Sequence, residues 1–80
     1  MNKTELVAAI ENGNTEFVSS VEATQWTVHE TIYAGRPGCW MADGVEFHSG
    51  ESAGFFVENS LPELCTVLEQ LELEEAAPAE

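Results

Sequence analysis

The chain of 80 residues carries 15 acidic side chains and only two basic ones, Lys3 and Arg36, so its formal net charge is −13, while 44% of its residues are hydrophobic. This charge argues against direct binding of nucleic acid, because phosphate contacts need clusters of lysine and arginine, and against attraction to anionic membranes. No run of 18 apolar residues and no basic start followed by an apolar stretch is present, so we expect neither a membrane span nor a signal peptide, and a cytoplasmic location.

The first predicted element is a short helix over residues 4–12. Thr4 is the expected N-cap, and Gly13 is expected to end the helix. Residues 14–25 fit either a helix or an extended chain, and their β-branched residues favour a strand slightly. The apolar side chains of the helix have the spacing of one helical face: Leu6, Val7 and Ile10.

A strand is predicted over residues 26–33, where β-branched and aromatic side chains dominate. Alternation places Trp26, Val28 and Ile32 on one side of this strand. Residues 35–38, which contain two glycines and a proline, are expected to form a loop.

A β-hairpin is predicted around Asp43 and Gly44, because an Asp-Gly pair between two apolar segments is a strong signal for a two-residue turn. Its arms would be residues 39–42 and 45–48. A turn over 49–53 would then lead into a further strand.

That further strand spans residues 54–58, with Phe55 and Val57 on one face and Phe56 on the other. Its alternation and the turn before it complete an antiparallel arrangement of three to four strands.

The best-defined helix begins after Ser60. Ser60 is the expected N-cap, Glu63 completes a capping box, and Pro62 suits the first turn. Residues 74–80 are acidic and are expected to form a disordered tail. One apolar stripe runs along the helix: Leu61, Leu64, Cys65, Leu68 and Leu71.

These elements predict an α+β domain over residues 1–73, in which a small antiparallel sheet of three to four strands is flanked by an N-terminal and a C-terminal helix. A single core of this size stabilises the fold by only a few kcal/mol, so dimerisation is a plausible aid. An aromatic side chain exposed on the sheet would favour a homodimer.

The residues that could carry chemistry do not form a recognisable site. Cys39, Cys65, His29 and His48 are of the right types for zinc, but no metal-binding spacing is present. The predicted hairpin would bring Cys39 close to His48, yet two residues do not make an active site. We therefore expect no disulfide, no metal, no cofactor and no enzymatic activity. Arg36 is expected to pair with a nearby glutamate.

The charge itself favours an inhibitor that imitates nucleic acid, because a small rigid domain with many carboxylates can occupy a basic DNA-binding groove. The alternatives are a protein–protein adaptor or oligomeric module whose charge serves solubility, and adaptation to high salt. Fourteen of the fifteen acids are glutamates, which disfavours salt adaptation, since salt-adapted surfaces are enriched in aspartate as well.

In size, charge and α+β pattern, the chain resembles the small acidic anti-CRISPR proteins encoded by phages, a class without a signature motif. The resemblance implies a non-enzymatic inhibitor that binds the basic nucleic-acid-binding surface of a CRISPR–Cas effector complex and blocks target DNA. The expected contacts, inferred from the residues of this chain, are outward-facing acids on the second helix and the sheet: Glu63, Glu69, Glu72, Glu74, Glu30 and Glu46.

Overall fold

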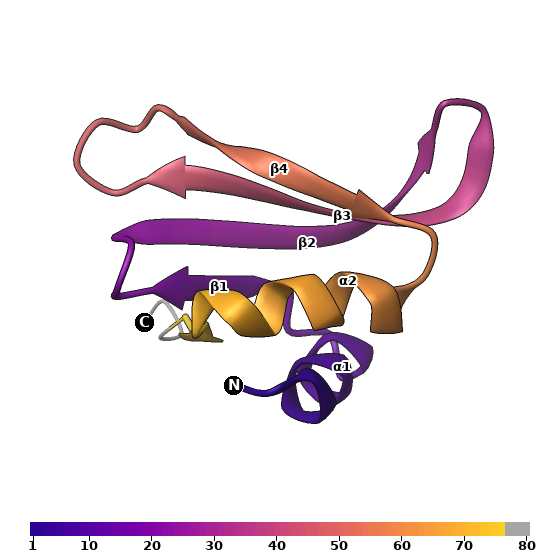
Figure 1. Ribbon diagram of the computed structural model, residues 1–80, viewed down its shortest axis with the longest axis horizontal. Helices are drawn as coiled ribbons and strands as arrows, with labels where there is room; N and C mark the ends of the chain where they lie inside the picture. Colours follow the sequence, from indigo (N-terminus) through magenta and orange to yellow (C-terminus); the bar gives the residue numbers. More distant parts are fainter. Residues whose placement is uncertain (77–80) are drawn as a thin grey trace.

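The computed structural model describes residues 1–76, which form one antiparallel sheet and two helices (Figure 1). The fold is therefore α+β, as predicted, with five strands where three to four were expected. In chain order the elements are α1 (Lys3–Glu11), β1 (Glu16–Ser19), β2 (Thr24–Tyr33), β3 (Arg36–Glu46), β4 (Ser52–Glu58), α2 (Leu61–Leu68), the 3-10 helix η1 (Glu69–Leu71) and β5 (Glu74–Glu75).

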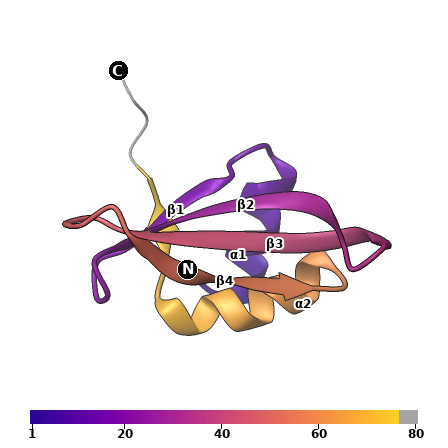
Figure 2. The ribbon, with the colours of Figure 1, turned by 90° about the horizontal axis from the view of Figure 1, so that it is seen from above.

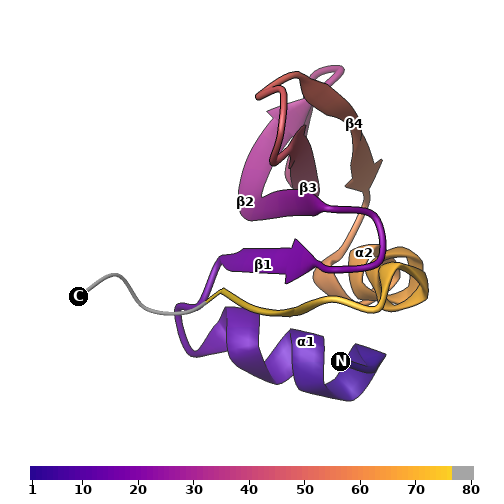
Figure 3. The same cartoon turned by 90° about the vertical axis from the view of Figure 1, so that its left-hand side faces the viewer.

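The sheet has the strand order β4-β3-β2-β1-β5, and every neighbouring pair is antiparallel. The first four strands form a meander. The chain then crosses back along α2, which lies over one face of the sheet, and β5 pairs with β1 at the opposite edge (Figure 1). Seen from the side, α1 lies below β1 and next to α2 (Figure 3). The first residue therefore lies close to the start of β5, and the Met1 amino group donates a hydrogen bond to the Leu73 carbonyl.

The hydrophobic core lies between the two helices and the face of the sheet that they cover. The strand register places Phe17, Trp26 and Ala42 on this face. The indole ring of Trp26 stacks on the ring of Phe56, with centroids 5.3 Å apart. Both helices contribute apolar side chains that are buried in the same cluster: Leu6, Ala9, Ile10, Leu61, Leu64, Cys65 and Leu68.

Strands β2 and β3 extend beyond the core as a long hairpin (Figure 2). Their turn consists of Ala34 and Gly35, which both have positive φ (52° and 78°), the combination that a two-residue hairpin turn requires. The loop predicted over 35–38 is therefore mostly the start of β3. Ile32, which was predicted on the same side of the strand as Trp26 and Val28, lies beyond the reach of the helices and is 71% exposed, whereas the other two are buried.

The hairpin predicted at Asp43 and Gly44 is also wrong, because β3 runs straight through both residues and the turn follows Glu46. Gly44 lies directly opposite Trp26 in the register. A β-carbon at Gly44 would lie 2.6–2.8 Å from three atoms of the Trp26 ring. The glycine makes room for the indole, and tertiary packing rather than a turn explains its place.

Helix α1 matches the prediction in place but not in its cap. Asn2, rather than Thr4, is the N-cap, and its side chain accepts a hydrogen bond from the Glu5 amide at 2.9 Å. The Glu5 carboxylate in turn accepts from the Asn2 amide at 2.9 Å, which completes a capping box. The alternative over residues 14–25 is resolved in favour of a strand, β1.

Helix α2 begins where predicted, but Glu63 does not complete the predicted capping box, because its carboxylate accepts from the Ser60 hydroxyl and not from the Ser60 backbone amide. Ser60 is its N-cap and accepts from the Glu63 amide at 3.3 Å, and Pro62 lies in the first turn. The α-helix ends at Leu68, and the last turn tightens into η1. The predicted disordered tail is wrong where it begins, because Glu74 and Glu75 form β5; residues 77–80 lie outside the described part.

None of the helices in residues 1–76 is both long and apolar enough to cross a membrane.

Candidate acidic interface

The acidic side chains are almost entirely without cationic partners. Within residues 1–76 a single ion pair occurs, between the His29 imidazole Nε2 and the Asp43 carboxylate at 3.0 Å. The Arg36 guanidinium donates to the Asn59 side-chain oxygen at 3.3 Å, so its predicted pairing with a glutamate is wrong. Because no glutamate in this part of the chain has a cationic partner, the negative charge is available to a ligand.

Much of this charge gathers where β1, β5, the end of β3 and the C-terminal end of α2 meet. We call this group the acidic end. All of its side chains are exposed. Glu69 lies in η1, Glu72 follows η1 in a left-handed conformation (φ 54°), and β5 supplies two further carboxylates. The acidic end consists of Glu5, Glu22, Glu46, Glu69, Glu72, Glu74 and Glu75.

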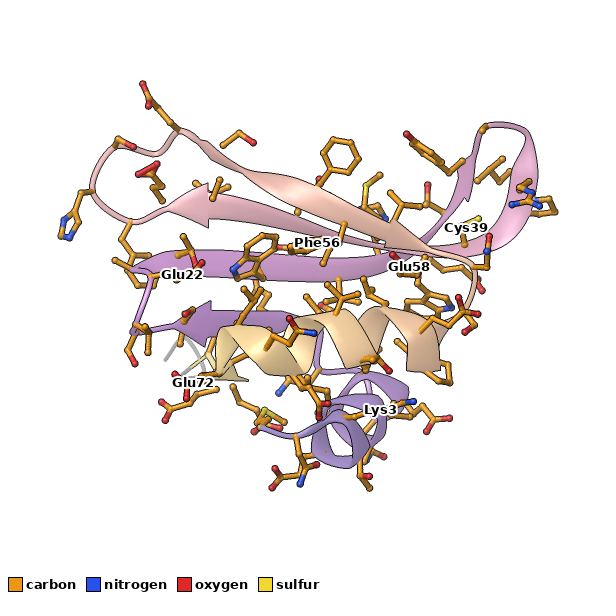
Figure 4. The ribbon with its side chains drawn as sticks, viewed as in Figure 1. Lys3, Glu22, Cys39, Phe56, Glu58 and Glu72 are labelled. Atoms are coloured by element: carbon orange, nitrogen blue, oxygen red, sulfur yellow. The ribbon has the colours of Figure 1, made fainter. Side chains whose placement is uncertain are left out.

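A buried serine holds two parts of the acidic end together. The Ser19 hydroxyl is fully buried, donates to the Leu71 carbonyl at 3.0 Å and accepts from the Glu22 amide at 3.3 Å. The β1–β2 turn that carries Glu22 is thereby fastened to the segment that carries Glu72. Figure 4 shows both labelled glutamates at this end of the molecule.

The same turn is fastened to the end of β3. The Phe47 amide donates to the Ala23 carbonyl at 3.0 Å, and Thr24 lies opposite Glu46 in the register. Backbone hydrogen bonds therefore place Glu46 next to the turn that carries Glu22.

Helix α1 completes the acidic end. The Lys3 backbone amide donates to the Glu69 carboxylate at 2.8 Å, which joins the first turn of α1 to η1. An open groove of about 550 Å³ runs between α1 and β5, and three of its lining residues are Glu5, Glu74 and Glu75. Three carboxylates around one groove can accept a lysine or arginine side chain from a partner.

The structure brings together four of the six predicted contact residues. Glu46, Glu69, Glu72 and Glu74 belong to the acidic end, whereas Glu30 and Glu63 do not.

Glu30 lies in β2 opposite Trp40, well away from the β1–β2 turn. Glu63 lies in the first turn of α2, and its carboxylate accepts from the Ser60 hydroxyl at 3.2 Å. Glu63 and Glu69 are six positions apart, which corresponds to roughly 9 Å along the helix axis.

Three members of the acidic end were missed from the sequence: Glu5, Glu22 and Glu75. The capping pattern Asn2-x-x-Glu5 was a usable local signal for the start of α1, but it does not reveal which end of the sheet the helix approaches. Nothing local marks Ser19 as the residue that joins Glu22 to this surface.

The proximity predicted for Cys39 and His48 is wrong, because it depended on the absent hairpin. Cys39 pairs with Thr31 across β2, while His48 lies in the β3–β4 turn. Seven residues of extended strand between Cys39 and Glu46 span about 23 Å. Cys39 and Cys65 are both free and buried. Among residues 1–76, no group of three or more His, Cys, Asp or Glu side chains is placed to hold a metal ion.

A second surface is the face of the sheet that points away from the helices. Phe55 is 55% exposed and lies across from Asp43 on this face. Val45, on the same side of β3, is 43% exposed. The His29–Asp43 pair lies on this face as well, so the Asp43 carboxylate has a partner within the chain.

Comparisons of the chain with protein-family models, with curated proteins and with solved structures find no match.

Proposed function

We propose that this protein is a small acidic inhibitor that binds the basic nucleic-acid-binding surface of a CRISPR–Cas effector complex and blocks the binding of target DNA in the cytoplasm of a bacterial host cell. The observation that supports this proposal is the acidic end, where seven exposed glutamates without cationic partners converge from distant parts of the chain.

The spacing of these carboxylates is compatible with imitation of a nucleic-acid backbone. Neighbouring strands lie about 4.8 Å apart, and Glu46, Glu22 and Glu74 lie on or between successive strands at one end of the sheet. Duplex DNA carries one phosphate per about 3.4 Å of each strand. The three carboxylates therefore offer a groove of lysines and arginines a row of negative charges about 7 Å apart, which is a lower charge density than that of the phosphates in duplex DNA.

Rigidity strengthens such imitation. The Ser19 hydrogen bonds and the Lys3–Glu69 contact hold the backbone of the acidic end in place before a partner arrives. A preorganised surface loses less conformational entropy on binding than a flexible acidic tail does. Attraction between the anionic inhibitor and a basic partner surface also speeds their association. Because salt screens this attraction, the binding should weaken as the salt concentration increases.

The test is inhibition of DNA binding by a purified effector complex, measured with two variants of equal charge. Glu72→Lys/Glu74→Lys alters the acidic end, and Glu11→Lys/Glu30→Lys alters surfaces outside it. Each substitution changes the charge by two, so both variants change the net charge from −13 to −9.

We expect the first variant to lose at least about tenfold in potency, which corresponds to about 1.4 kcal/mol, and the second to change much less. Equal losses would mean that net charge alone matters. Unchanged potency in both would reject the acidic end as the binding surface. Added DNA should displace the inhibitor, and high salt should release it.

The alternative is a non-enzymatic adaptor or oligomeric module whose charge serves solubility. The exposed Phe55 on the uncovered face of the sheet favours it, because exposed aromatic side chains are typical of protein contacts. A partner recovered from a bacterial lysate that resists high salt and added DNA would support this alternative over DNA imitation.

A further inference from the structure

The two edges of the sheet differ sharply in how they are protected. At one edge, β5 has two residues and both are glutamates. Short strands and charged side chains are established means of preventing edge-to-edge pairing. At the other edge, β4 has seven residues, contains neither proline nor lysine, and carries a single charge, Glu58, at its end. A bulge at Ala53 shifts its register with β3, so the regular part of this edge is residues 54–58. In a chain with 15 acids among 80 residues, this long neutral edge is the exception.

The β4 edge is also accessible. Residues 52–55 are exposed, and α2 contacts β4 from the covered face of the sheet rather than from its side (Figures 1 and 2). An edge strand presents backbone N–H and C=O groups along its free side. Phe55 adds an exposed aromatic ring beside this edge, and Val57 lies on the same face.

We propose that two copies of this chain pair through their β4 strands, antiparallel and about a two-fold axis, and so join two five-stranded sheets into one of ten strands. The proposal does not rest on the inhibitory function.

A register centred on Phe55 suits the sequence of β4. Phe55 of one copy then faces Phe55 of the other on the uncovered face, as a cross-strand aromatic pair. Glu58 of each copy then lies beside the bulge at Ala53 of the other, so no two like charges are directly opposed. Phe56 lies opposite Gly54, which has no side chain to obstruct the ring.

Charge favours the pairing of two copies through their β4 edges over pairing through their β5 edges. Glu74 and Glu75 on β5 are four strand spacings from β4 in each copy, or about 19 Å. This distance exceeds the Debye length of about 8 Å at physiological salt. Two chains of charge −13 can therefore meet at β4 while keeping their β5 edges apart. Because β4 can pair with an identical antiparallel strand, the same segment of both copies forms the contact.

The salt dependence of this dimer is opposite to that of the proposed inhibition. The remaining long-range repulsion between two anionic chains is screened by salt, so dimerisation should strengthen as salt increases. Binding to a basic surface should weaken. The two proposals can therefore fail independently.

The test is sedimentation equilibrium of the full chain from about 10 μM to about 1 mM, a range that covers weak association, at low and high salt. We expect a mass shift from 8.7 kDa towards twice that value, with at least about a threefold lower Kd at about 1 M salt than at about 0.1 M. In NMR spectra, the amide signals that change with concentration should be those of β4.

Phe55→Lys should abolish the dimer, because it places two like charges opposite each other. Ile32→Lys is the matched control, since Ile32 is 71% exposed and lies on β2; it makes the same chemical change and should leave the dimer intact. A chain that stays monomeric throughout overturns the proposal and leaves the edge to an extended segment of another protein. A dimer that survives Phe55→Lys, or whose affected amides lie outside β4, overturns it equally.

Discussion

Substitution of Gly44 by alanine should destabilise the protein through a clash with Trp26. The new β-carbon would lie 2.6 Å, 2.7 Å and 2.8 Å from three ring atoms, whereas favourable carbon–carbon contacts lie at about 3.5–4.0 Å. The ring must therefore move by about 1 Å. It cannot do so freely, because it stacks on Phe56 and its Nε1 donates to the Thr24 hydroxyl at 2.9 Å.

The expected loss in the free energy of unfolding is about 2 kcal/mol. Overpacking of a well-filled core costs about 1–3 kcal/mol, and the upper end applies because the obstacle is a buried ring held on two sides. Replacing glycine by alanine also lowers the conformational entropy of the unfolded chain, which offsets about 0.4–1 kcal/mol of the loss in stability. For a domain of this size, whose total stability is about 4–12 kcal/mol, the loss corresponds to a Tm lower by about 10–15 °C.

Urea and thermal unfolding, followed by circular dichroism and tryptophan fluorescence, measure this loss. The control is a double-mutant cycle with Trp26→Phe, which removes the ring atoms that the new methyl group would meet. The two substitutions should couple by at least about 1 kcal/mol, with the double variant more stable than the sum of the singles predicts. A glycine required by a turn would show no such coupling. Stability of Gly44→Ala within about 0.5 kcal/mol of the parent, or additive effects in the cycle, would refute the packing explanation.

Three further predictions concern single side chains. Ser60→Ala should lower the free energy of unfolding by about 1 kcal/mol through loss of the α2 N-cap, as measured in urea. Ser19→Ala should cost about 1–3 kcal/mol, because the Leu71 carbonyl loses its buried donor; a loss below 0.5 kcal/mol would contradict the role of Ser19 in holding the acidic end. Burial raises the pKa of the Cys65 thiol to about 11, against an opposing effect of Lys3. The resulting stabilisation is complete below the unfolded pKa of 9.0 and is lost as the pH rises towards about 11. Urea titrations across this range should show that loss, and Cys65→Val should reduce it.

Several elements could be predicted from local sequence because local physics decides them. The Ser60 cap, Pro62 and the leucine stripe define α2 without reference to any other part of the chain. The run of β-branched and aromatic residues defines β2 in the same way. The charge of −13 follows from composition alone, and so does the expectation that a partner would be basic.

Where local signals competed with packing, packing decided. Asp43-Gly44 has the sequence of a tight turn, but the indole of Trp26 needs the space that Gly44 leaves, and β3 continues. The turn between β3 and β4 follows Glu46 instead, while the turn between β2 and β3 consists of Ala34 and Gly35, where the predicted loop over residues 35–38 begins. Glu74 and Glu75 looked like a solvated tail, yet pairing with β1 turns them into a strand.

The acidic end is the clearest case of a feature that only the tertiary structure determines. The sequence by itself determined that the surface is anionic and that Glu69, Glu72 and Glu74 lie close together along the chain. It could not show that Glu5 and Glu22 join them, because that depends on α1 folding back against α2 and on one buried hydroxyl, Ser19, that joins two distant segments. Contacts between residues far apart in the chain leave no periodic or local pattern in the sequence. The surface that they create therefore forms only when the helices and strands pack together.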